Sequence, residues 1–225
     1  MIALHNVTFR WPAASENCLR NLTLTLDRGE WVALIGDNGA GKSTLLRLMA
    51  GLLTPQQGEV LLKGQPLSAL NAPQRAAQVG VLFQEAENQI LHSTVQREVA
   101  FGLKLQKLPA PVIEQRTRAA LELCGLADVA QAHPLDLHAA QRRMVAVASL
   151  EALAPPVLLL DEPSRDFDER WLAVFEGWLA VCRQRQTTLL AISHDYDFTR
   201  RHFSRVIRLA DGKICADGLP AQRLS

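Results

Sequence analysis

A glycine-rich segment followed by Lys and Ser carries the clearest chemistry in the sequence. The run G-D-N-G-A-G-K-S begins at Gly36 and has the form G-x-x-x-x-G-K-S. Glycine permits the positive φ angles that turn backbone N–H groups inward around phosphate oxygens, and without a Cβ it leaves room for them. The pattern predicts a nucleotide-binding loop made of Gly36, Asp37, Asn38, Gly39, Ala40, Gly41, Lys42, Ser43 and Thr44.

Lys42 and Ser43, which directly follow the last glycine, suit the binding of a phosphate chain. Lys42 would place a positive charge beside the β- and γ-phosphates, and Ser43 would offer its hydroxyl to Mg²⁺. The helix predicted after the loop directs the positive end of its dipole at the same anion. An apolar run at 31–35 precedes the loop and a helical pattern follows it. A glycine turn without a ligand is the alternative, and we expect ATP and Mg²⁺ instead.

Polar side chains end three other apolar runs, at Gln84, at Asp161-Glu162 and at Ser193-His194. Buried parallel strands read as continuous apolar runs, and ligands bind at their carboxyl ends. Asp161 could hold Mg²⁺ through water, which leaves Glu162 to polarise an attacking water. Gln84 and His194 are available to sense a γ-phosphate. Taken singly, such residues are more often a solvated turn, a surface glutamine and a structural histidine, but together behind the phosphate loop they favour hydrolysis.

Composition narrows the class of protein. The chain has 225 residues, is 48% hydrophobic and carries a net charge of +1, so it can bury a core and has no basic excess of the kind that binds nucleic acid. Four cysteines without C-x-x-C spacing indicate a reducing compartment and core packing. Neither a signal peptide nor an apolar run of about 20 residues is visible, so we expect any membrane role to be peripheral.

Strands and helices alternate around the phosphate loop. Hydrophobic periodicity predicts an edge strand over 1–10 and further strands over 22–26, 31–35, 57–64, 79–83, 157–160 and 187–192. The helix after the loop is expected to bury Leu45, Leu46, Leu48, Met49 and Leu52. The aromatic residues at 171–179 fall at helical spacing and are interpreted as core rather than as a binding surface.

The segment from about 85 to 150 has the pattern of helices with polar faces. Helices are predicted over 112–124 and about 139–154. In the second helix, Met144, Val147 and Leu150 define the buried side, and Arg142-Arg143 are placed on the opposite side. We therefore expect a helical insertion in the α/β chain.

The order and spacing of these motifs resemble those of the ATP-binding-cassette (ABC) ATPases over nearly the whole chain. The resemblance implies an α/β P-loop NTPase fold with a mixed core sheet, an edge antiparallel β-subdomain and an inserted helical subdomain. Residues 1–225 would then form one domain, with the core and β-subdomain at about 1–84 and 151–225 and the helical subdomain at about 85–150.

The family also implies roles for individual residues. Asp161 would be the metal-side carboxylate, Glu162 the base, and His194 the γ-phosphate switch. Gln84 would contact the metal and couple hydrolysis to transport, and Asp168 would lie in the loop that crosses a dimer. Trp11 matches the aromatic on which the family stacks adenine. A tryptophan packed only on its strand neighbours is the alternative at Trp11.

A longer match narrows the subfamily. The segment 81–89, with Thr94-Val95 and 98–102, is similar to that of the energy-coupling-factor (ECF) importers, which take up vitamins and metal ions such as cobalt and nickel. In that family the segment grips a short helix of a membrane subunit, so Gln84 to Gln89 would be both ATP sensor and contact. Many ATPases of that group carry an extra carboxyl-terminal piece, whereas this chain ends soon after 211–213.

The sequence departs from the family at its signature motif, where Leu-Ser-Gly-Gly-Gln is expected. Here the residues are Leu137, His138, Ala139, Ala140 and Gln141. In the family this motif opens a helix and contacts the γ-phosphate held by the opposite subunit. The two alanines add methyl groups at a close approach, and His138 is a poorer cap than Ser by about 1 kcal/mol unless Asp136 takes over. The helix could still bind ATP loosely, and a protonated His138 could replace the lost hydroxyl.

The resemblance implies an ATPase subunit that energises transport from the cytoplasmic face of the cell membrane. Its partners would be ATP, an integral membrane subunit and a second ABC ATPase, which the altered signature suggests is non-identical. One rival is a mechanical or repair ABC ATPase, but the coiled-coil insertions or paired cassettes of that class are not seen. A second rival is a regulatory subunit that binds ATP without hydrolysing it.

Overall fold

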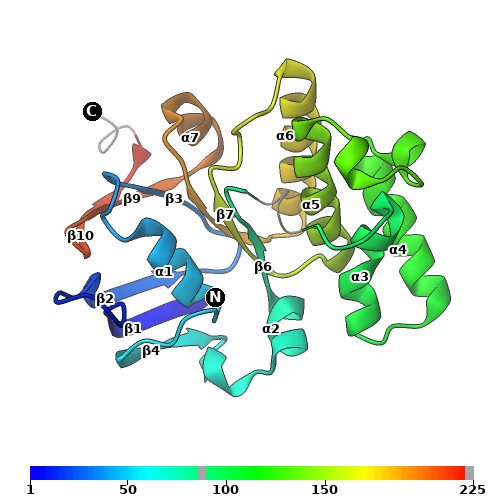
Figure 1. Ribbon diagram of the computed structural model, residues 1–225. Helices are drawn as coiled ribbons and strands as arrows, with labels where there is room; N and C mark the ends of the chain where they lie inside the picture. Colours follow the sequence, from blue (N-terminus) through cyan, green and yellow to red (C-terminus); the bar gives the residue numbers. More distant parts are fainter. Residues whose placement is uncertain (86–89, 221–225) are drawn as a thin grey trace.

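The computed structural model describes residues 1–85 and 90–220, and its strands form two sheets connected by helices (Figure 1). The strands are β1 (Ile2–Phe9), β2 (Leu19–Leu26), β3 (Trp31–Ile35), β4 (Gln57–Leu62), β5 (Gln65–Pro66), β6 (Val79–Leu82), β7 (Val157–Asp161), β8 (Thr188–Ile192), β9 (Arg205–Ala210) and β10 (Lys213–Gly218). The α-helices are α1 (Lys42–Met49), α2 (Ala72–Gln78), α3 (Val95–Leu105), α4 (Ala110–Leu123), α5 (Ala139–Leu153), α6 (Glu169–Gln184) and α7 (Tyr196–His202). Short 3-10 helices cover η1 (Leu67–Ala69), η3 (Ala127–Val129) and η4 (Pro134–Asp136).

The larger sheet positions the candidate site. Its strand order is β10-β9-β3-β8-β7-β6, in which β9 to β6 are parallel neighbours and β10 runs antiparallel to β9. Because the carboxyl ends of parallel strands meet at one edge, the segments after β3, β6, β7 and β8 converge there. This arrangement confirms the predicted mixed sheet.

The smaller sheet is antiparallel, with the order β2-β1-β4-β5. The prediction that residues 1–10 form an edge strand is wrong, because Leu4 of β1 pairs with Leu24 of β2 on one side and with Val60 of β4 on the other. The alternation of apolar side chains in β1 identifies a strand with a buried face, but it carries no information about a partner more than 50 residues away.

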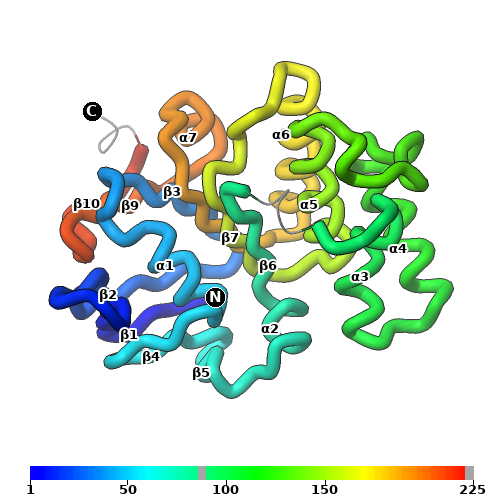
Figure 2. The backbone as a smooth tube through the Cα atoms, in the orientation of Figure 1, coloured from blue at the N-terminus to red at the C-terminus, as the bar shows by residue number. Residues whose placement is uncertain are grey.

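Two hydrophobic clusters cover the two faces of the larger sheet. In β3, Val32 and Leu34 face a cluster shared with α1 and the smaller sheet. Trp31, Ala33 and Ile35 face the other cluster, which includes α3, α4, α5 and α6. Side chains of a strand alternate between faces, so a five-residue buried strand contributes to both clusters. Figure 2 shows the chain leaving β6 for α3, α4 and α5, which lie together, and returning through β7.

Three side-chain predictions need correction. Helix α1 ends at Met49, so Leu52 lies beyond it with 57% of its surface exposed. Arg143 is only 1% exposed and lies on the buried side of α5 rather than opposite it. Of the cysteines expected in the core, Cys124 and Cys182 are buried, whereas Cys18 is half-buried and Cys215 is exposed.

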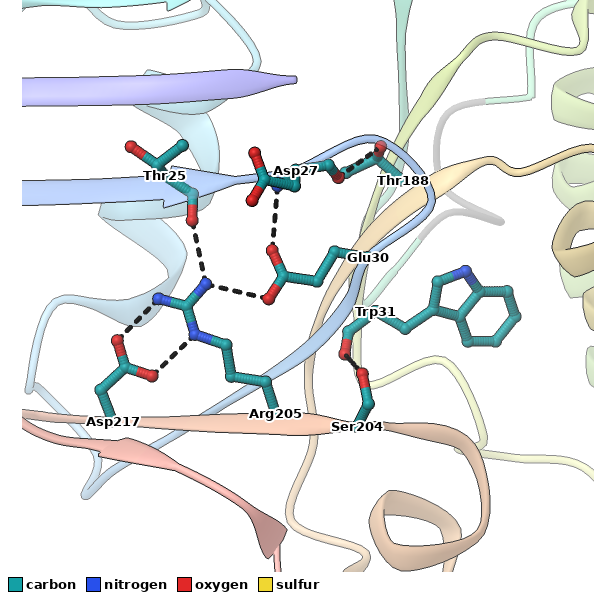
Figure 3. A network of polar contacts seen from close by, with 8 residues as sticks. All are labelled: Thr25, Asp27, Glu30, Trp31, Thr188, Ser204, Arg205 and Asp217. Carbon is teal, nitrogen blue, oxygen red and sulfur yellow. Dashed lines mark hydrogen bonds and ion pairs between the residues drawn. The ribbon is translucent and has the colours of Figure 1, made fainter.

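A polar network ties the last two strands to the rest of the fold (Figure 3). Arg205 of β9 makes two hydrogen bonds to Asp217 of β10, at 2.7 and 2.6 Å. Its Nη1 donates to Glu30 Oε1 and to the Thr25 carbonyl, both at 3.0 Å. Glu30 in turn accepts from the Asp27 N–H at 2.9 Å. One guanidinium therefore connects β9 and β10 to the end of β2 and the turn before β3.

Candidate nucleotide-binding site

The phosphate loop joins β3 to α1 in a conformation that glycine permits. Gly41 has φ 103°, and a Cβ there would lie 2.8 Å from Leu19 Cδ2. At Gly36, a Cβ would lie 2.2 Å from the carbonyl oxygen of Leu209 in β9. Both positions combine a positive φ with a close approach of another segment, so any other residue would displace the loop.

The Lys42 side chain folds back onto the phosphate loop and hydrogen-bonds to its backbone. Its Nζ donates to the carbonyl of Gly36 at 2.6 Å and to that of Asp37 at 2.9 Å. The side chain is buried, and desolvation lowers the pKa of the ammonium, although Glu162, Asp161 and Asp37 oppose the shift. The ammonium thus lies among carbonyl oxygens and acidic groups within the cleft.

Ser43 and Asp161 form a pair of oxygen donors across the cleft. Ser43 Oγ donates to Asp161 Oδ2 at 3.3 Å, and Asp161 is 7% exposed at the end of β7. Burial raises the pKa of this carboxyl, although the Ser43 hydrogen bond and three nearby cations act against the shift. Mg²⁺ prefers hard oxygen ligands and is usually held by one or two protein groups together with phosphates and water. A hydroxyl and a carboxylate oxygen 3.3 Å apart fit that description.

Glu162 and His194 face each other at the ends of β7 and β8. His194 Nε2 lies 3.5 Å from Glu162 Oε1, and the His194 N–H donates to Glu162 Oε2 at 3.3 Å. Burial raises the pKa of the Glu162 carboxyl, and the contacts with His194 counteract part of the rise. Glu162 also has φ 48°, which is unfavourable for a residue with a side chain. Costly backbone of this kind occurs often at functional sites.

These groups line one cleft of about 700 Å³. Five residues that the sequence singles out lie in it, namely Lys42, Ser43, Asp161, Glu162 and His194. The other lining residues are Trp11, Cys18, Asn38, Gly39, Gly41, Thr44, Gln84, Arg165 and Ile192. The structure therefore brings together the predicted catalytic and metal residues, and it adds Cys18 and Arg165, which the motifs did not indicate.

Trp11 lies at the rim of this cleft and is not a buried strand residue. Its side chain is 37% exposed, and its ring meets the Phe9 ring edge-on, with centroids 5.2 Å apart. Phe9 packs against the indole, and the exposed part of Trp11 lines the cleft. The geometry leaves a ring surface available to a flat ligand.

The altered signature lies outside this cleft, at the start of α5. His138 is the N-cap, and its Nδ1 accepts the Gln141 N–H at 3.4 Å, so the alternative in which Asp136 takes over the cap is not the one adopted. The His138 ring also rests against Trp171, with centroids 5.7 Å apart. Ala139 is exposed and Ala140 is buried. His138, Ala139, Ala140 and Gln141 are therefore separate from the phosphate loop of their own chain.

Asp168 and the segment after Gln84 complete the set of predicted residues. Asp168 caps α6, because its Oδ1 accepts the Trp171 N–H at 2.8 Å. Glu87, Asn88 and Gln89 belong to 86–89, outside the described residues. None of the helices in 1–85 and 90–220 is long and apolar enough to cross a membrane.

Sequence reasoning missed Arg143. Its Nη1 donates to the Gln84 carbonyl at 2.8 Å, and its Nη2 donates to the carbonyls of Asp161 and Glu162 at 3.2 and 2.7 Å. A signal was present, because residue 143 lies one helical turn before Val147, which had been placed on the buried side. The neighbouring Arg142 hides this signal, because an Arg-Arg doublet is typical of a solvent-facing side of a helix.

Comparison with known proteins agrees with this geometry. Residues 19–165 match the family model described as "ABC transporter". The energy-coupling factor transporter ATP-binding protein EcfA1 of Streptococcus sanguinis is 33% identical over 227 residues, which cover 100% of this chain and 81% of that protein. The structure of cbiO1 from Clostridium perfringens, described as part of the ABC transporter complex cbiONQ, has a TM-score of 0.86 and 26% identity and covers 99% of this chain and 90% of that chain.

A second solved structure resembles the chain over almost its full length. The ATP-binding cassette MJ0796, in a dimeric post-hydrolysis state bound to ADP and Pi, has a TM-score of 0.87 and 26% identity, covering 98% of this chain and 99% of that chain. The family match spans 147 of 225 residues, from 19 to 165. The chain therefore belongs to the ABC transporter family, as an ATP-binding and ATP-hydrolysing subunit homologous to the ECF transporter ATPases.

Proposed function

We propose that the chain powers an importer of the ECF type, which takes up a vitamin or a metal ion through a separate membrane subunit. The observation that carries the proposal is the convergence of Lys42, Asp161, Glu162 and His194 in one cleft. Similarity to EcfA1 and to cbiO1 supports the importer assignment.

In the proposed reaction, each residue acts on MgATP bound in the cleft. Lys42 and the N–H groups of the phosphate loop bind the β- and γ-phosphates and balance the charge that develops during hydrolysis. Glu162 orients and polarises the attacking water, and His194 holds that carboxylate and contacts the γ-phosphate. Ser43, Asp161 and Gln84 would hold Mg²⁺, which supplies charge neutralisation at the phosphate oxygens.

The membrane contact is proposed for the region of Gln84 to Gln89. A groove of about 530 Å³ lies beside the described part of this region, lined by Leu52, Leu53, Phe83, Gln84 and Glu85 among others. Leu52 is 57% exposed in a groove that also reaches Ser43 and Asp161. A short amphipathic helix of a membrane subunit could therefore contact this surface and the nucleotide site together. On this proposal the chain works at the cytoplasmic face of the membrane.

The second ATPase is proposed to be a different chain. The residues of this chain's own phosphate site are present. The signature motif, which would contact the ATP held by the partner, is altered at His138, Ala139 and Ala140. A partner with an intact signature would complete this chain's site. The other site of the pair, on the partner's phosphate loop, would face the altered motif, hold ATP and hydrolyse it slowly. The alternative of ATP binding without hydrolysis would therefore apply to that site alone.

Leu52→Asp tests the importer assignment in membranes. Cells expressing the chain with its co-purifying membrane subunit would be assayed for uptake of labelled B vitamins, Co²⁺ and Ni²⁺. We expect Leu52→Asp to abolish uptake and release the ATPase from the membrane fraction, because it places a charge in an apolar contact. ATP affinity should stay unchanged. Leu105→Asp, at a 52% exposed leucine outside this groove, is the matched control.

Two results would contradict the importer assignment. In one, no labelled vitamin or metal ion is taken up by cells that hold the intact complex. In the other, Leu52→Asp and Leu105→Asp have equal effects on membrane association, in which case the groove is not the contact.

A further inference from the structure

A buried guanidinium joins the two strand ends that carry Gln84 and Glu162. Strands β6 and β7 are paired up to Leu82 and Leu160, and two residues beyond that pair lie Gln84 and Glu162. Arg143 donates to the carbonyl oxygens of both, at 2.8 and 2.7 Å. The side chain therefore continues the link between the two segments where the sheet hydrogen bonds have ended.

The conformation of Glu162 depends on such external bonds. Its φ of 48° is disfavoured for a residue with a Cβ and persists only where surrounding contacts enforce it. Its N–H donates to the Ile192 carbonyl at 2.9 Å, and its own carbonyl accepts from Arg143. Both ends of the residue are thus fixed, one by β8 and the other by α5. These bonds set the direction in which the carboxylate enters the cleft.

The guanidinium is suited to this task by its shape. It is planar, it carries donors in a fixed fork, and it stays protonated even when buried. Arg143 is 1% exposed, so water does not compete for its donors. If the Gln84 segment or α5 moved, the fork could not keep both carbonyls, and the backbone of Glu162 would lose one of its constraints.

We infer that Arg143 is a positioning residue, which aligns Glu162 for hydrolysis and makes that alignment depend on the Gln84 segment and on α5. The inference rests on the proposed function, in which Glu162 orients the attacking water. His138 is the N-cap of helix α5, and Gln84 belongs to the proposed membrane contact. The Arg143 side chain would thus connect Glu162 both to the signature motif at the start of α5 and to the proposed membrane contact.

The test compares Arg143→Lys and Arg143→Gln with wild type and with Arg118→Lys. Lys keeps the charge without the fork, and Gln keeps a single NH2 group without the charge. Arg118 lies on neighbouring helix α4 with 66% of its side chain exposed, so its replacement controls for a general effect of Arg removal. Turnover would be measured in the ATPase complex purified from membranes, and MgATP binding by calorimetry on the purified chain.

We expect both Arg143 variants to lower kcat at least about tenfold, because small misplacements of a reacting group are costly. KM and ATP affinity should stay within about threefold, since the phosphate loop is untouched. Hydrogen exchange with a bound non-hydrolysable ATP analogue should become faster in peptides covering 160–166. Peptides covering 144–152 should keep wild-type protection, which a general loss of structure would not allow.

Several results would overturn the inference. They are a kcat within about twofold of wild type, a parallel loss of ATP affinity, faster exchange throughout α5, or failure of both variants to fold, which would make Arg143 a structural anchor. Glu162→Gln in the same assay separates the two claims. Full turnover by Glu162→Gln would remove the proposed base, whereas an unaffected Arg143 variant beside an inactive Glu162→Gln would refute only the positioning role.

Discussion

His194 contacts both carboxylate oxygens of Glu162, one through its ring and the other through its backbone. The ring Nε2 lies 3.5 Å from Oε1, and the backbone N–H donates to Oε2 at 3.3 Å. The two residues come from adjacent strand ends, so the β7–β8 pairing sets their separation. In the proposed reaction His194 also contacts the γ-phosphate, so this pair would link sensing of that phosphate to orientation of the base.

The buried carboxylate of Asp161 should lower the free energy of unfolding of the nucleotide-free protein at neutral pH. Desolvation raises the pKa of Asp161, so between its ordinary pKa near 3.8 and its raised value the folded protein binds more protons than the unfolded chain. The free energy of unfolding therefore falls as pH rises through that window. We expect Asp161→Asn to raise Tm at pH 7.5 without nucleotide, by about 2–4 °C for each kcal/mol gained.

Differential scanning calorimetry at two pH values checks this sign. The gain from Asp161→Asn should shrink as the pH falls through the raised pKa of Asp161, because the folded wild type takes up the proton there. Asp128→Asn, at an exposed aspartate, should leave Tm unchanged at both values. A lower Tm for Asp161→Asn at pH 7.5 would show that the ionised carboxylate stabilises the fold instead.

Trp11 should contribute to ATP affinity by stacking on the adenine. The exposed ring at the rim of the cleft offers a flat surface, and stacking of a base on an aromatic ring is worth about 1–3 kcal/mol. Trp11→Ala should therefore weaken ATP binding by roughly tenfold or more, whereas Trp11→Phe should retain most of it. Calorimetric titration of both variants with MgATP measures the difference. Equal affinities for wild type and Trp11→Ala would assign the indole to packing on Phe9.

Restoring the signature should activate the isolated chain. In a homodimer both sites would face His138, Ala139 and Ala140, and losing one transition-state donor costs about 2.7–4 kcal/mol. We expect weak ATPase activity from the chain alone, a large gain with its partner ATPase, and a large gain from the combined change His138→Ser, Ala139→Gly and Ala140→Gly. Steady-state phosphate release measures all three. Robust turnover by the unmodified chain without a partner would refute the unequal pair.

Arg205 should be important for stability and unimportant for nucleotide binding. It contacts Asp217, Glu30 and the Thr25 carbonyl with 25% of its side chain exposed. Arg205→Ala removes the shared donor, and we expect a loss of roughly 1–3 kcal/mol in urea unfolding with ATP affinity preserved in the folded protein. Arg20→Ala breaks a surface pair with Glu16, 42% exposed on the Arg side, and should cost much less. Equal losses for the two variants would mean that the network adds nothing beyond a surface pair.

The site residues that could be predicted from the sequence are those whose place depends only on neighbouring residues along the chain. Lys42 and Glu162 follow short apolar runs, and strand ends reach the same edge of a parallel sheet whatever the details of packing. Arg143 could not be assigned a role in this way, because its contacts come from two segments about 20 and 60 residues away. The central place of β1 was missed for the same reason. His138 capped its helix because an imidazole nitrogen can accept a backbone N–H as a hydroxyl does.

Turnover by Glu162→Gln, with Lys42→Ala as its comparison, tests the central claim most directly. The amide keeps the shape of Glu162 and cannot act as the base, so the chain in its purified complex should bind MgATP with wild-type affinity and release no phosphate in steady state. Lys42→Ala should instead lose affinity for MgATP itself. Hydrolysis by Glu162→Gln within about threefold of the wild-type rate would contradict the account.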